Sequence, residues 1–481
     1  MSAPDGWEAV IGLEIHVQLA TSSKIFCGSP TAYGAPPNTH VDPVTLGMPG
    51  VLPVLNREVV EMALKVGLAL GCDIDRESRF ARKHYFYPDL PKGYQISQYE
   101  EPICSGGGVW AEVDGQERFF PLTRIHLEED AGKTVHDGAR DRSLVDYNRA
   151  GVPLIETVSE PDLRSADEAV AYMKALHQVV VALGVCDGNM EQGNFRCDAN
   201  VSVRPVGQEA FGTRVELKNI NSFRFVGRGI DYEIERQVAV LEEGGQVDQE
   251  TRLWDEQASM TRVLRGKEDA HDYRYFPDPD LITVEIDEAW IERVKASLPE
   301  LPRERRKRYE EEMGLSSYDA GVLTQSAALS SYFEEVCGPV DDPKLVANWV
   351  QGELLSWLNR EERGIEDSPV SAAALGEMLG LVKSGEISTK MGKACFAAMA
   401  NDGVSPGDWV ASHGGQITDE GAIEEVVSQV LDAHPEQVAS YLEGKTKIMG
   451  FLVGQVMRAT GGKANPQMVN QVAARLMEDR R

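Results

Sequence analysis

Up to about Ile291, the chain is dominated by segments in which apolar and polar residues alternate. The clearest is Val10–Leu19, where the odd positions are apolar and the even positions include Glu14 and His16. Alternation with a period of two is typical of a strand that buries one face. Three further segments show it, namely Arg124–Glu128, Arg196–Arg204 and Arg214–Lys218.

Helical spacing of apolar residues interrupts this region at Asn56–Leu70, Ser165–Leu183 and Phe225–Glu242. Strands and helices together predict an α+β region. From Glu292 onward the spacing is helical throughout. It predicts helices at Asp341–Leu358 and Ser371–Leu381, with Ser371 as the N-cap of the second.

Turn-forming residues cluster at Asn401–Gly407 and divide the helical part in two. We therefore expect a mixed-sheet domain over 1–292, an all-helical domain over 293–405 and a helical tail domain over 406–481. The length of 481 residues agrees with this division, since a typical domain has about 150.

The chain carries 48 basic and 77 acidic residues, a net charge of −29. A surface this acidic binds nucleic acid only where basic residues gather locally. Between Ser440 and Arg481, seven basic residues face three acidic ones. This tail is the candidate nucleic-acid contact, and a solvated helical surface is the alternative.

Three features predict a cytoplasmic protein. The seven cysteines are scattered without a C-x-x-C pair, which indicates a reducing compartment. No apolar stretch approaches the roughly 20 residues that a membrane span needs. The first residues have neither the basic nor the apolar region of an export signal.

Glu14 and His16 lie two apart on one predicted strand, so their side chains leave the same face about 7 Å apart. A carboxylate and an imidazole at that separation can share a divalent ion; a buried histidine bonded to a neighbouring strand is the alternative. The tract Glu128-Glu129-Asp130 adds three consecutive acids, which repel one another when buried unless a cation or protons intervene. Strict alternation would place Glu128 beside His126. We expect a bulge here, which leaves open which acid points inward.

Gly132-Lys133-Thr134 resembles the end of a phosphate-binding P-loop, but that motif needs a glycine where Leu127 stands. The acidic tract before it would also repel phosphate. We therefore reject a P-loop, and an ATP site here would hold metal-bridged phosphates on a sheet. The aromatic loop that follows Lys83 contains Lys92 as well, and both lysines are candidates to hold a phosphate or an anionic intermediate.

Five long strings closely resemble the B subunit of the bacterial aspartyl/glutamyl-tRNA amidotransferases. The resemblance runs from about residue 7 to the C-terminus. The strings are Gly12–Leu19, Lys83–Gln95, Asn148–Glu156, Glu216–Ser222 and Asp272–Pro277.

The resemblance implies a cradle domain similar in fold to glutamine synthetase, with a mixed, largely antiparallel sheet. It implies that ATP phosphorylates the side-chain carboxylate of Glu-tRNA(Gln) or Asp-tRNA(Asn), and that ammonia then displaces the phosphate. It also implies Mg²⁺, because phosphoryl transfer between two anions needs charge neutralisation. The implied ligands are Glu14, His16 and Glu129, with Glu128, Glu156 and Asp198 as neighbours. The implied loop near the ammonia path contains Lys83, Lys92, Tyr85 and Tyr87.

The resemblance also implies a heterotrimer, because ammonia comes from a separate amidase A subunit and a small C subunit clasps the other two. The tail would contact the tRNA body, and we expect Lys445, Lys447 and Lys463 to meet phosphates. Many family members carry four zinc-binding cysteines, but these positions read Cys27, Ser29, Asp42 and Thr45 here. One thiolate cannot hold structural zinc, so we expect no zinc and a Pro36–Asn38 loop held by packing.

Two other functions remain open from the sequence. A non-catalytic scaffold that presents aminoacyl-tRNA to a partner would share the basic tail but would not need Glu14 and His16. A free-standing amide ligase using ATP and ammonia would work without an amidase subunit.

Overall fold

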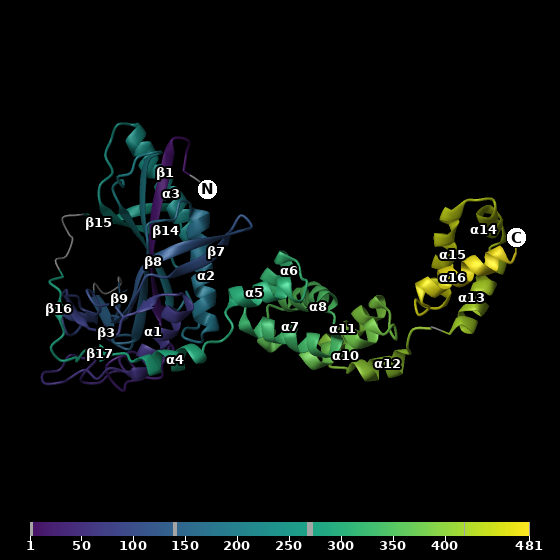
Figure 1. Ribbon diagram of the computed structural model, residues 1–481, viewed down its shortest axis with the longest axis horizontal. Helices are drawn as coiled ribbons and strands as arrows, with labels where there is room; N and C mark the ends of the chain where they lie inside the picture. Colours follow the sequence, from purple (N-terminus) through teal and green to yellow (C-terminus); the bar gives the residue numbers. More distant parts are fainter. Residues whose placement is uncertain (1–2, 138–141, 267–272, 418, 481) are drawn as a thin grey trace. The chain divides into compact units, whose positions relative to one another are not determined.

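The computed structural model describes residues 3–137, 142–266, 273–417 and 419–480. The chain divides into two compact units, Met1–Arg303 and Glu304–Arg481 (Figure 1). Asp272, the first residue of one string in the family resemblance, lies outside the described residues. None of the described helices is both long and apolar enough to cross a membrane.

The described part of the first unit is built on a 13-stranded sheet whose main path runs β15-β14-β13-β12-β1-β11-β8-β5-β4-β16. Only β13 and β14 pair in parallel among the described strands, so the sheet is mixed but largely antiparallel, as the family resemblance implied. Its strands are β1 (Trp7–Gln18), β2 (Asp73–Ile74), β4 (Ala81–His84), β5 (Tyr94–Ser97), β6 (Cys104–Ser105), β7 (Gly108–Val113), β8 (Gln116–Glu129), β11 (Pro153–Ser159), β12 (Phe195–Pro205), β13 (Val215–Lys218), β14 (Glu250–Asp255), β15 (Met260–Gly266) and β16 (Phe276–Pro277). Two small sheets pair β9 (Lys133–Asp137) with β10 (Arg142–Asp146) and β3 (Glu77–Ser78) with β17 (Val284–Glu285).

Helices cover one face of this sheet (Figure 1). They are α1 (Arg57–Ala69), α2 (Ala166–Ala182) and α3 (Phe223–Glu242), with the short α4 (Glu288–Ala296) beside α1. The first three begin within two residues of the starts predicted from apolar spacing. Each starts at a side chain that caps the helix, since Asn56, Ser165 and Ser222 accept hydrogen bonds from backbone N–H groups in the first turn.

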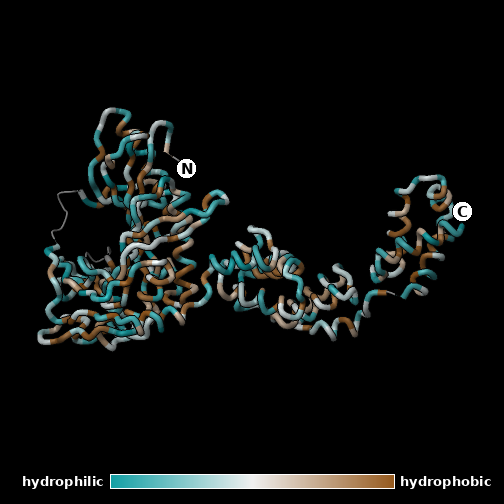
Figure 2. Tube along the Cα trace, viewed as in Figure 1, coloured by the Kyte–Doolittle hydropathy of each residue, from teal (hydrophilic) through white to brown (hydrophobic). Residues whose placement is uncertain are grey.

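The alternating pattern of β1 decides which face of the sheet is open. Ile11, Leu13, Ile15 and Val17 are buried in the core against the helices. Each such side chain contributes about 1.5–3 kcal/mol through removal from water, and Figure 2 shows apolar positions gathered between sheet and helices. A one-residue slip would exchange the two faces, so this core fixes the polar residues of β1 on the opposite, open side.

The expected bulge in the acidic tract is wrong. β8 continues to Glu129, with Glu128 opposite Leu154 and Glu129 opposite Pro153 in regular register. The irregularity in this pairing lies farther along, between Val158 and Ser159. Simple alternation therefore places Glu128 on the face of His126 and Glu129 on the other.

The second unit is helical throughout its described residues, apart from one isolated bridge. Its two hydrophobic cores run from Tyr309 to Trp409 and from Ile423 to Met477. The first contains α5 (Pro302–Glu311), α6 (Ser317–Leu323), α7 (Ala327–Val340), α8 (Pro343–Trp349), α9 (Ser356–Arg360), α10 (Ala372–Lys383), α11 (Thr389–Asp402) and α12 (Pro406–His413). The second contains α13 (Glu420–Ala433), α14 (Pro435–Leu442), α15 (Met449–Ala459) and α16 (Pro466–Glu478).

Two local features of this unit bear on the sequence predictions. Ser371 caps α10, with its hydroxyl accepting a hydrogen bond from the Ala374 N–H, as predicted. The single helix predicted over Asp341–Leu358 is instead α8, a π-helical turn over Val350–Leu355, and α9. Apolar spacing does not reveal such a turn, because it inserts one residue without ending the helix.

Candidate active site

Four neighbouring strands place one polar residue each in a single row across the open face of the sheet. In the order β12, β1, β11, β8 the row reads Arg196, His16, Glu156 and His126, each opposite the next in the strand register. Residues opposite one another in antiparallel strands have Cβ atoms about 4.5–5.5 Å apart. The row therefore holds an imidazole on each side of one carboxylate.

His16, Glu128 and Glu156 form a cluster suited to a metal ion. One potential ligand atom from each lies within 4.8 Å of the other two. The His16 Nε2 atom is 3.5 Å from Glu128 Oε1 and 3.4 Å from Glu156 Oε2. An imidazole nitrogen and two carboxylates, with space left for water or phosphate oxygens, fit a divalent ion such as the Mg²⁺ expected from the sequence.

His126, on β8, contacts the Glu156 carboxylate of this cluster. Its Nδ1 accepts a hydrogen bond from Arg124 Nε at 3.4 Å, which leaves Nε2 facing the carboxylates. That Nε2 lies 3.3 Å from Glu156 Oε2, so the ring orients the carboxylate as outer-shell partners of metal ligands do. Burial works to raise the pKa of Glu156, but His126 and His16 outweigh it and hold that pKa well below its usual range. Glu156 is therefore an anion at neutral pH.

The two carboxylates also act on His16. Burial works to lower its pKa, but Glu156 and Glu128 outweigh burial and raise the pKa to about 9. In the metal-free protein, the proton on His16 therefore supplies the positive charge at the centre of the cluster. The same field that holds the proton would hold a divalent cation.

A cavity of about 760 Å³ opens over this cluster. On its β12–β13 side, Lys218 Nζ lies 2.5 Å from Asp198 and 3.1 Å from Glu216. Glu14 lines the same side and accepts a hydrogen bond from Asn200 at 2.9 Å. Burial, followed by the charge of Glu156, raises the pKa of Glu14. This side of the cavity thus gathers three carboxyl groups, with Lys218 and, at 3.8 Å from Glu216, Arg265 as the neighbouring cations.

The aromatic loop contributes a cation and a ring wall to the cavity. Lys83 and Tyr85 line it, and the Lys83 ammonium lies 4.9 Å from the centre of the Tyr273 ring. Burial works to lower the pKa of Lys83, but Glu128 and other groups outweigh burial and raise it, so the lysine is charged. Tyr87 is not brought to the cavity, since its side chain is 60% exposed elsewhere on the loop.

Glu129 is likewise not brought into the His16 cluster. Its carboxylate accepts hydrogen bonds from the Lys92 ammonium and, at 2.9 Å, from the Ile96 N–H. The Lys92 and Glu129 side chains are only 11% and 6% exposed. Glu129 and Lys92 thus form a buried ion pair on the far side of β8. The sequence left open which acid of the tract points inward, and in the structure it is Glu128 that lies beside His16.

Asp130 follows β8 and orients two arginines. Its carboxylate lies 3.0 Å from Arg196 Nη2 and 3.6 Å from Arg149 Nε, and it accepts a hydrogen bond from Gln18. Burial works to raise the pKa of Asp130, but the two arginines outweigh it and lower that pKa. Gly151, with φ near 80°, turns the chain sharply after Arg149 into β11.

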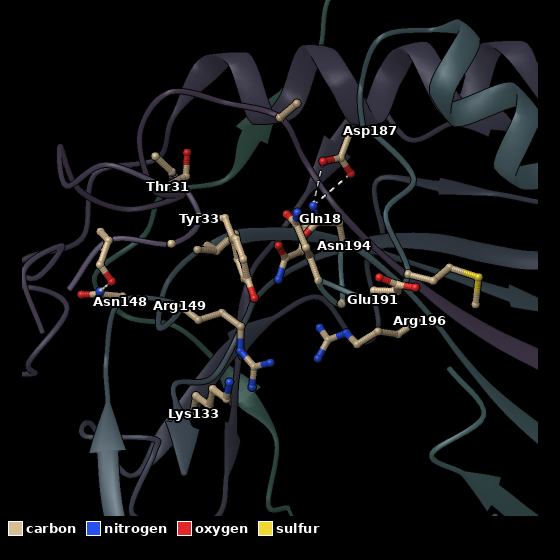
Figure 3. A pocket seen from close by; sticks show the side chains of 18 of the residues that line it. Gln18, Thr31, Tyr33, Lys133, Asn148, Arg149, Asp187, Glu191, Asn194 and Arg196 are labelled. Atoms are coloured by element: carbon tan, nitrogen blue, oxygen red, sulfur yellow. Dashed lines mark hydrogen bonds between the residues drawn. The ribbon is translucent and has the colours of Figure 1, made fainter. Parts of the chain in front are cut away.

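A second cavity, of about 680 Å³, adjoins the first, and the two share Arg149, Arg196 and Asn221 (Figure 3). Gly132-Lys133-Thr134 leads into β9 and not into a helix, so the P-loop interpretation stays rejected. Lys133 nevertheless lines this second cavity.

The remaining predicted residues lie outside both cavities. Lys445 and Lys447 are exposed, and Lys463 donates a hydrogen bond to the His413 carbonyl at 2.6 Å. Near the N-terminus, Asp42 accepts a hydrogen bond from the Thr45 N–H, and Cys27 Sγ lies 3.5 Å from Thr45 Oγ1.

Hydrogen bonds also hold the Pro36–Asn38 loop, where packing had been expected. The Asn148 side chain donates to the Pro36 carbonyl. Asn38 donates from its backbone N–H to the Asp146 carboxylate and from its side-chain amide to the Val145 carbonyl.

Sequence reasoning did not assign His126, Arg196 or Lys218 to the site. A signal was present for two of them. His126 stands two residues before Glu128 on one strand, and Arg196 stands two residues before Asp198 on another, so each pair shares a face. Lys218 was included only in the predicted strand Arg214–Lys218 and in the string Glu216–Ser222, without a role of its own.

Comparison with known proteins finds two family models and many curated relatives that match this chain. The family model described as the GatB/GatE catalytic domain matches residues 9–292, and the model described as the GatB domain matches residues 331–477. The B subunit of the aspartyl/glutamyl-tRNA(Asn/Gln) amidotransferase of Geotalea daltonii is 57% identical, covering 98% of this chain and 99% of its own. The corresponding B subunit of Thioalkalivibrio sulfidiphilus is 57% identical over 98% of this chain and 100% of its own.

Proposed function

The chain belongs to the family of aspartyl/glutamyl-tRNA(Asn/Gln) amidotransferase B subunits, and we propose that the cavity above His16 is where its reaction occurs. The chain is a subunit of a glutamine-dependent carbon–nitrogen ligase. In the proposed reaction, an oxygen of the glutamyl or aspartyl carboxylate attacks the γ-phosphorus of ATP, which releases ADP and leaves an acyl phosphate. Ammonia then forms the C–N bond at the carbonyl carbon and inorganic phosphate leaves.

The observation that carries the proposal is the convergence of His16, Glu128 and Glu156 at one point of the cavity. These residues would hold Mg²⁺, with Glu14 and Asp198 as further acids of the same cavity. When bound, the ion would neutralise the phosphate oxygens as the carboxylate approaches. His126 keeps Glu156 oriented for this task, and the raised pKa of Glu14 reflects its burial and the negative charge that surrounds it.

The lysines have different roles in this proposal. Lys83 faces the cavity as a cation, which supports a role in holding the acyl phosphate or the departing phosphate. Lys92 is paired with Glu129 behind β8, which suits a polar route for ammonia better than direct contact with substrate. Tyr85 lines the cavity next to Lys83, whereas the exposure of Tyr87 supports contact outside it.

The partners follow from the reaction. Ammonia is toxic and easily protonated in water, so a partner amidase A subunit would supply it directly from glutamine, and a small C subunit would complete the heterotrimer. The exposed Lys445 and Lys447, with Lys463, would contact the tRNA phosphates. We propose Glu-tRNA(Gln) and Asp-tRNA(Asn) as substrates, and the cytoplasm, where translation takes place, as the location.

The test uses the reconstituted heterotrimer with Mg²⁺, ATP, ammonium and Glu-tRNA(Gln). We expect formation of Gln-tRNA(Gln), and we expect His16→Ala to abolish it while tRNA still binds. His84→Ala is the matched control, because His84 lies outside the cavity lining and its removal should leave amidation intact. If His16→Ala amidates at the normal rate, the cavity is not the reaction centre and the scaffold function is favoured.

A further inference from the structure

The hairpin formed by β7 and the first residues of β8 is attached firmly to the first unit by one of its two faces. Val109 and Phe120 are buried in the hydrophobic core of that unit. Arg118, also on the hairpin, forms an ion pair with the buried Glu168 of α2. The opposite face of the hairpin is therefore held in a defined position at the surface.

That outer face presents two aromatic rings and two carboxylates. Trp110 lies opposite Phe119 in the strand register, with ring centres 5.1 Å apart, and each residue is 43% exposed. Glu112 lies opposite Glu117, two positions farther along the same face. Like charges directly opposite one another destabilise a strand pair unless a cation is near. An aromatic ring beside carboxylates is a surface that suits a guanidinium group.

Arg303 supplies that guanidinium group. Its Nε and Nη2 atoms donate hydrogen bonds to the two carboxylate oxygens of Glu117, at 2.6 and 2.9 Å. The central carbon of the guanidinium lies 4.4 Å from the centre of the Trp110 ring. A single exposed ion pair contributes little to stability, but a bidentate arginine–carboxylate contact that also stacks on an indole ring is among the stronger surface interactions.

Arg303 stands where the chain leaves the first unit. It is the last residue of that unit and the second residue of α5. Among the described residues that follow α4, 298–301 belong to neither a helix nor a strand, so the chain can bend there. Leu298 and Leu301 are only partly buried against the core of the first unit. The Arg303 contact is thus placed to decide whether the first turn of α5 stays on the hairpin or swings away from it.

We propose that Arg303 is a latch, which closes on Glu117 and Trp110 and, when it opens, lets the second unit turn about residues 298–301. Closing limits the range of orientations that the second unit can take. The latch itself does not depend on the proposed function. Its consequence does, because a tRNA held by the tail must bring its aminoacyl end to the cavity above His16, and a restricted joint raises the effective concentration of that end.

The first measurement is hydrogen exchange of the heterotrimer, followed in the peptide that spans residues 298–308. Arg303→Gln removes both interactions of the latch, and Glu117→Gln removes the ion pair but keeps the contact with the indole ring. Both positions are at the surface, so the fold should be kept. Arg262→Gln is the matched control, since Arg262 is an exposed arginine of β15 that forms an ion pair with Asp255 in the same unit.

We expect exchange to be about tenfold faster in Arg303→Gln and about three- to fivefold faster in Glu117→Gln. The control should leave the rate unchanged. The double variant should exchange no faster than Arg303→Gln alone, because that latch is already open. Unchanged exchange in Arg303→Gln overturns the proposal, and additive effects of the two replacements overturn the pairing on which it rests.

A second measurement separates a latch from a contact with only local effect. Spin labels are attached through a ketone-bearing amino acid at Val206 in the first unit and Tyr318 in α6, both highly exposed, and pulsed resonance records the distances between them. We expect a broader distribution of distances in Arg303→Gln than in the wild type, and the same one in Arg262→Gln. An unchanged distribution in Arg303→Gln overturns the latch even if exchange is faster. Neither measurement involves ATP or amidation, so failure of the latch is distinguishable from failure of the reaction centre.

Discussion

His16 and Glu156 face each other across β1 and β11, with the imidazole Nε2 3.4 Å from a carboxylate oxygen. This interaction joins two strings that lie about 140 residues apart in the sequence (156 minus 16). It depends on the register of an antiparallel pair, since a shift of one residue would turn one of the two side chains into the core. The apolar face of β1 therefore stabilises the site as well as the fold.

Adjacent acids at the end of β8 should behave differently toward metal. Glu128 points to His16, whereas Glu129 binds Lys92 on the far side. We expect Glu128→Gln to weaken Mg²⁺ or Mn²⁺ binding roughly 100-fold, since it removes a charged ligand. Glu129→Gln should change metal affinity less than about twofold. Calorimetry with each variant checks this, and a larger effect from Glu129→Gln would show that Glu129 and not Glu128 is the ligand.

The buried pair of Lys92 and Glu129 gives a prediction about stability. Replacing one partner leaves an unpaired charge in a water-poor site, which costs about 3–5 kcal/mol. Lys92→Met should therefore lower the free energy of unfolding of the first unit by about that amount. The double variant Lys92→Met/Glu129→Leu should recover most of the loss, because no charge remains buried. Urea denaturation followed by hydrogen exchange in β8 measures both, and additive losses would contradict a direct pairing.

The sequence could predict elements more readily than the contacts between them. The alternation of β1 correctly assigned Glu14 and His16 to one face, and apolar spacing placed the starts of α1, α2 and α3 within two residues. Local pattern carries this information because each element buries its own apolar side. The partner of His16 could not be predicted in the same way, because strand register depends on residues far apart in the chain.

The choice between Glu128 and Glu129 as the acid near His16 shows a second limit of prediction from local sequence pattern. Three consecutive acids invited the idea of a bulge, yet β8 is regular through the acidic tract and simple alternation gave the right geometry there. The buried carboxylate of Glu129 is neutralised by Lys92, 37 residues earlier, which no local pattern indicates. Asp130 likewise reads as a possible metal ligand, and only the tertiary structure shows that it binds two arginines.

The raised pKa of His16 predicts a dependence of stability on pH in metal-free protein. The pKa rises from 6.5 to about 9 on folding, because Glu156 and Glu128 outweigh burial. The protonated ring therefore stabilises the folded state fully below pH 6.5, and this contribution is lost as pH rises through 9. The loss is about 3 kcal/mol, at about 1.4 kcal/mol for each pKa unit.

The measurement compares the chain with His16→Gln in the presence of a chelator. Between about pH 6 and about pH 9.5, the wild type should lose about 3 kcal/mol more unfolding free energy than the variant. The difference reports the protonation of His16 together with its effect on the Glu156 carboxylate, whose pKa His16 helps to lower. Parallel pH profiles would mean that the ring is neutral and that the carboxylates hold a proton instead.

The three lysines of the tail should not contribute equally to tRNA binding. Lys445 and Lys447 are exposed, whereas Lys463 donates to the His413 carbonyl and joins two segments of the helical unit. Removing one lysine–phosphate interaction reduces the salt slope of binding by up to about one. We expect Lys445→Ala/Lys447→Ala to lower the slope by about two and Lys463→Ala to lower it by less. Filter binding of Glu-tRNA(Gln) from about 50 to about 300 mM salt measures the slopes, and Arg228→Gln, an exposed arginine of α3 outside both cavities, serves as the control. An unchanged slope in the double variant would make the tail an ordinary solvated surface.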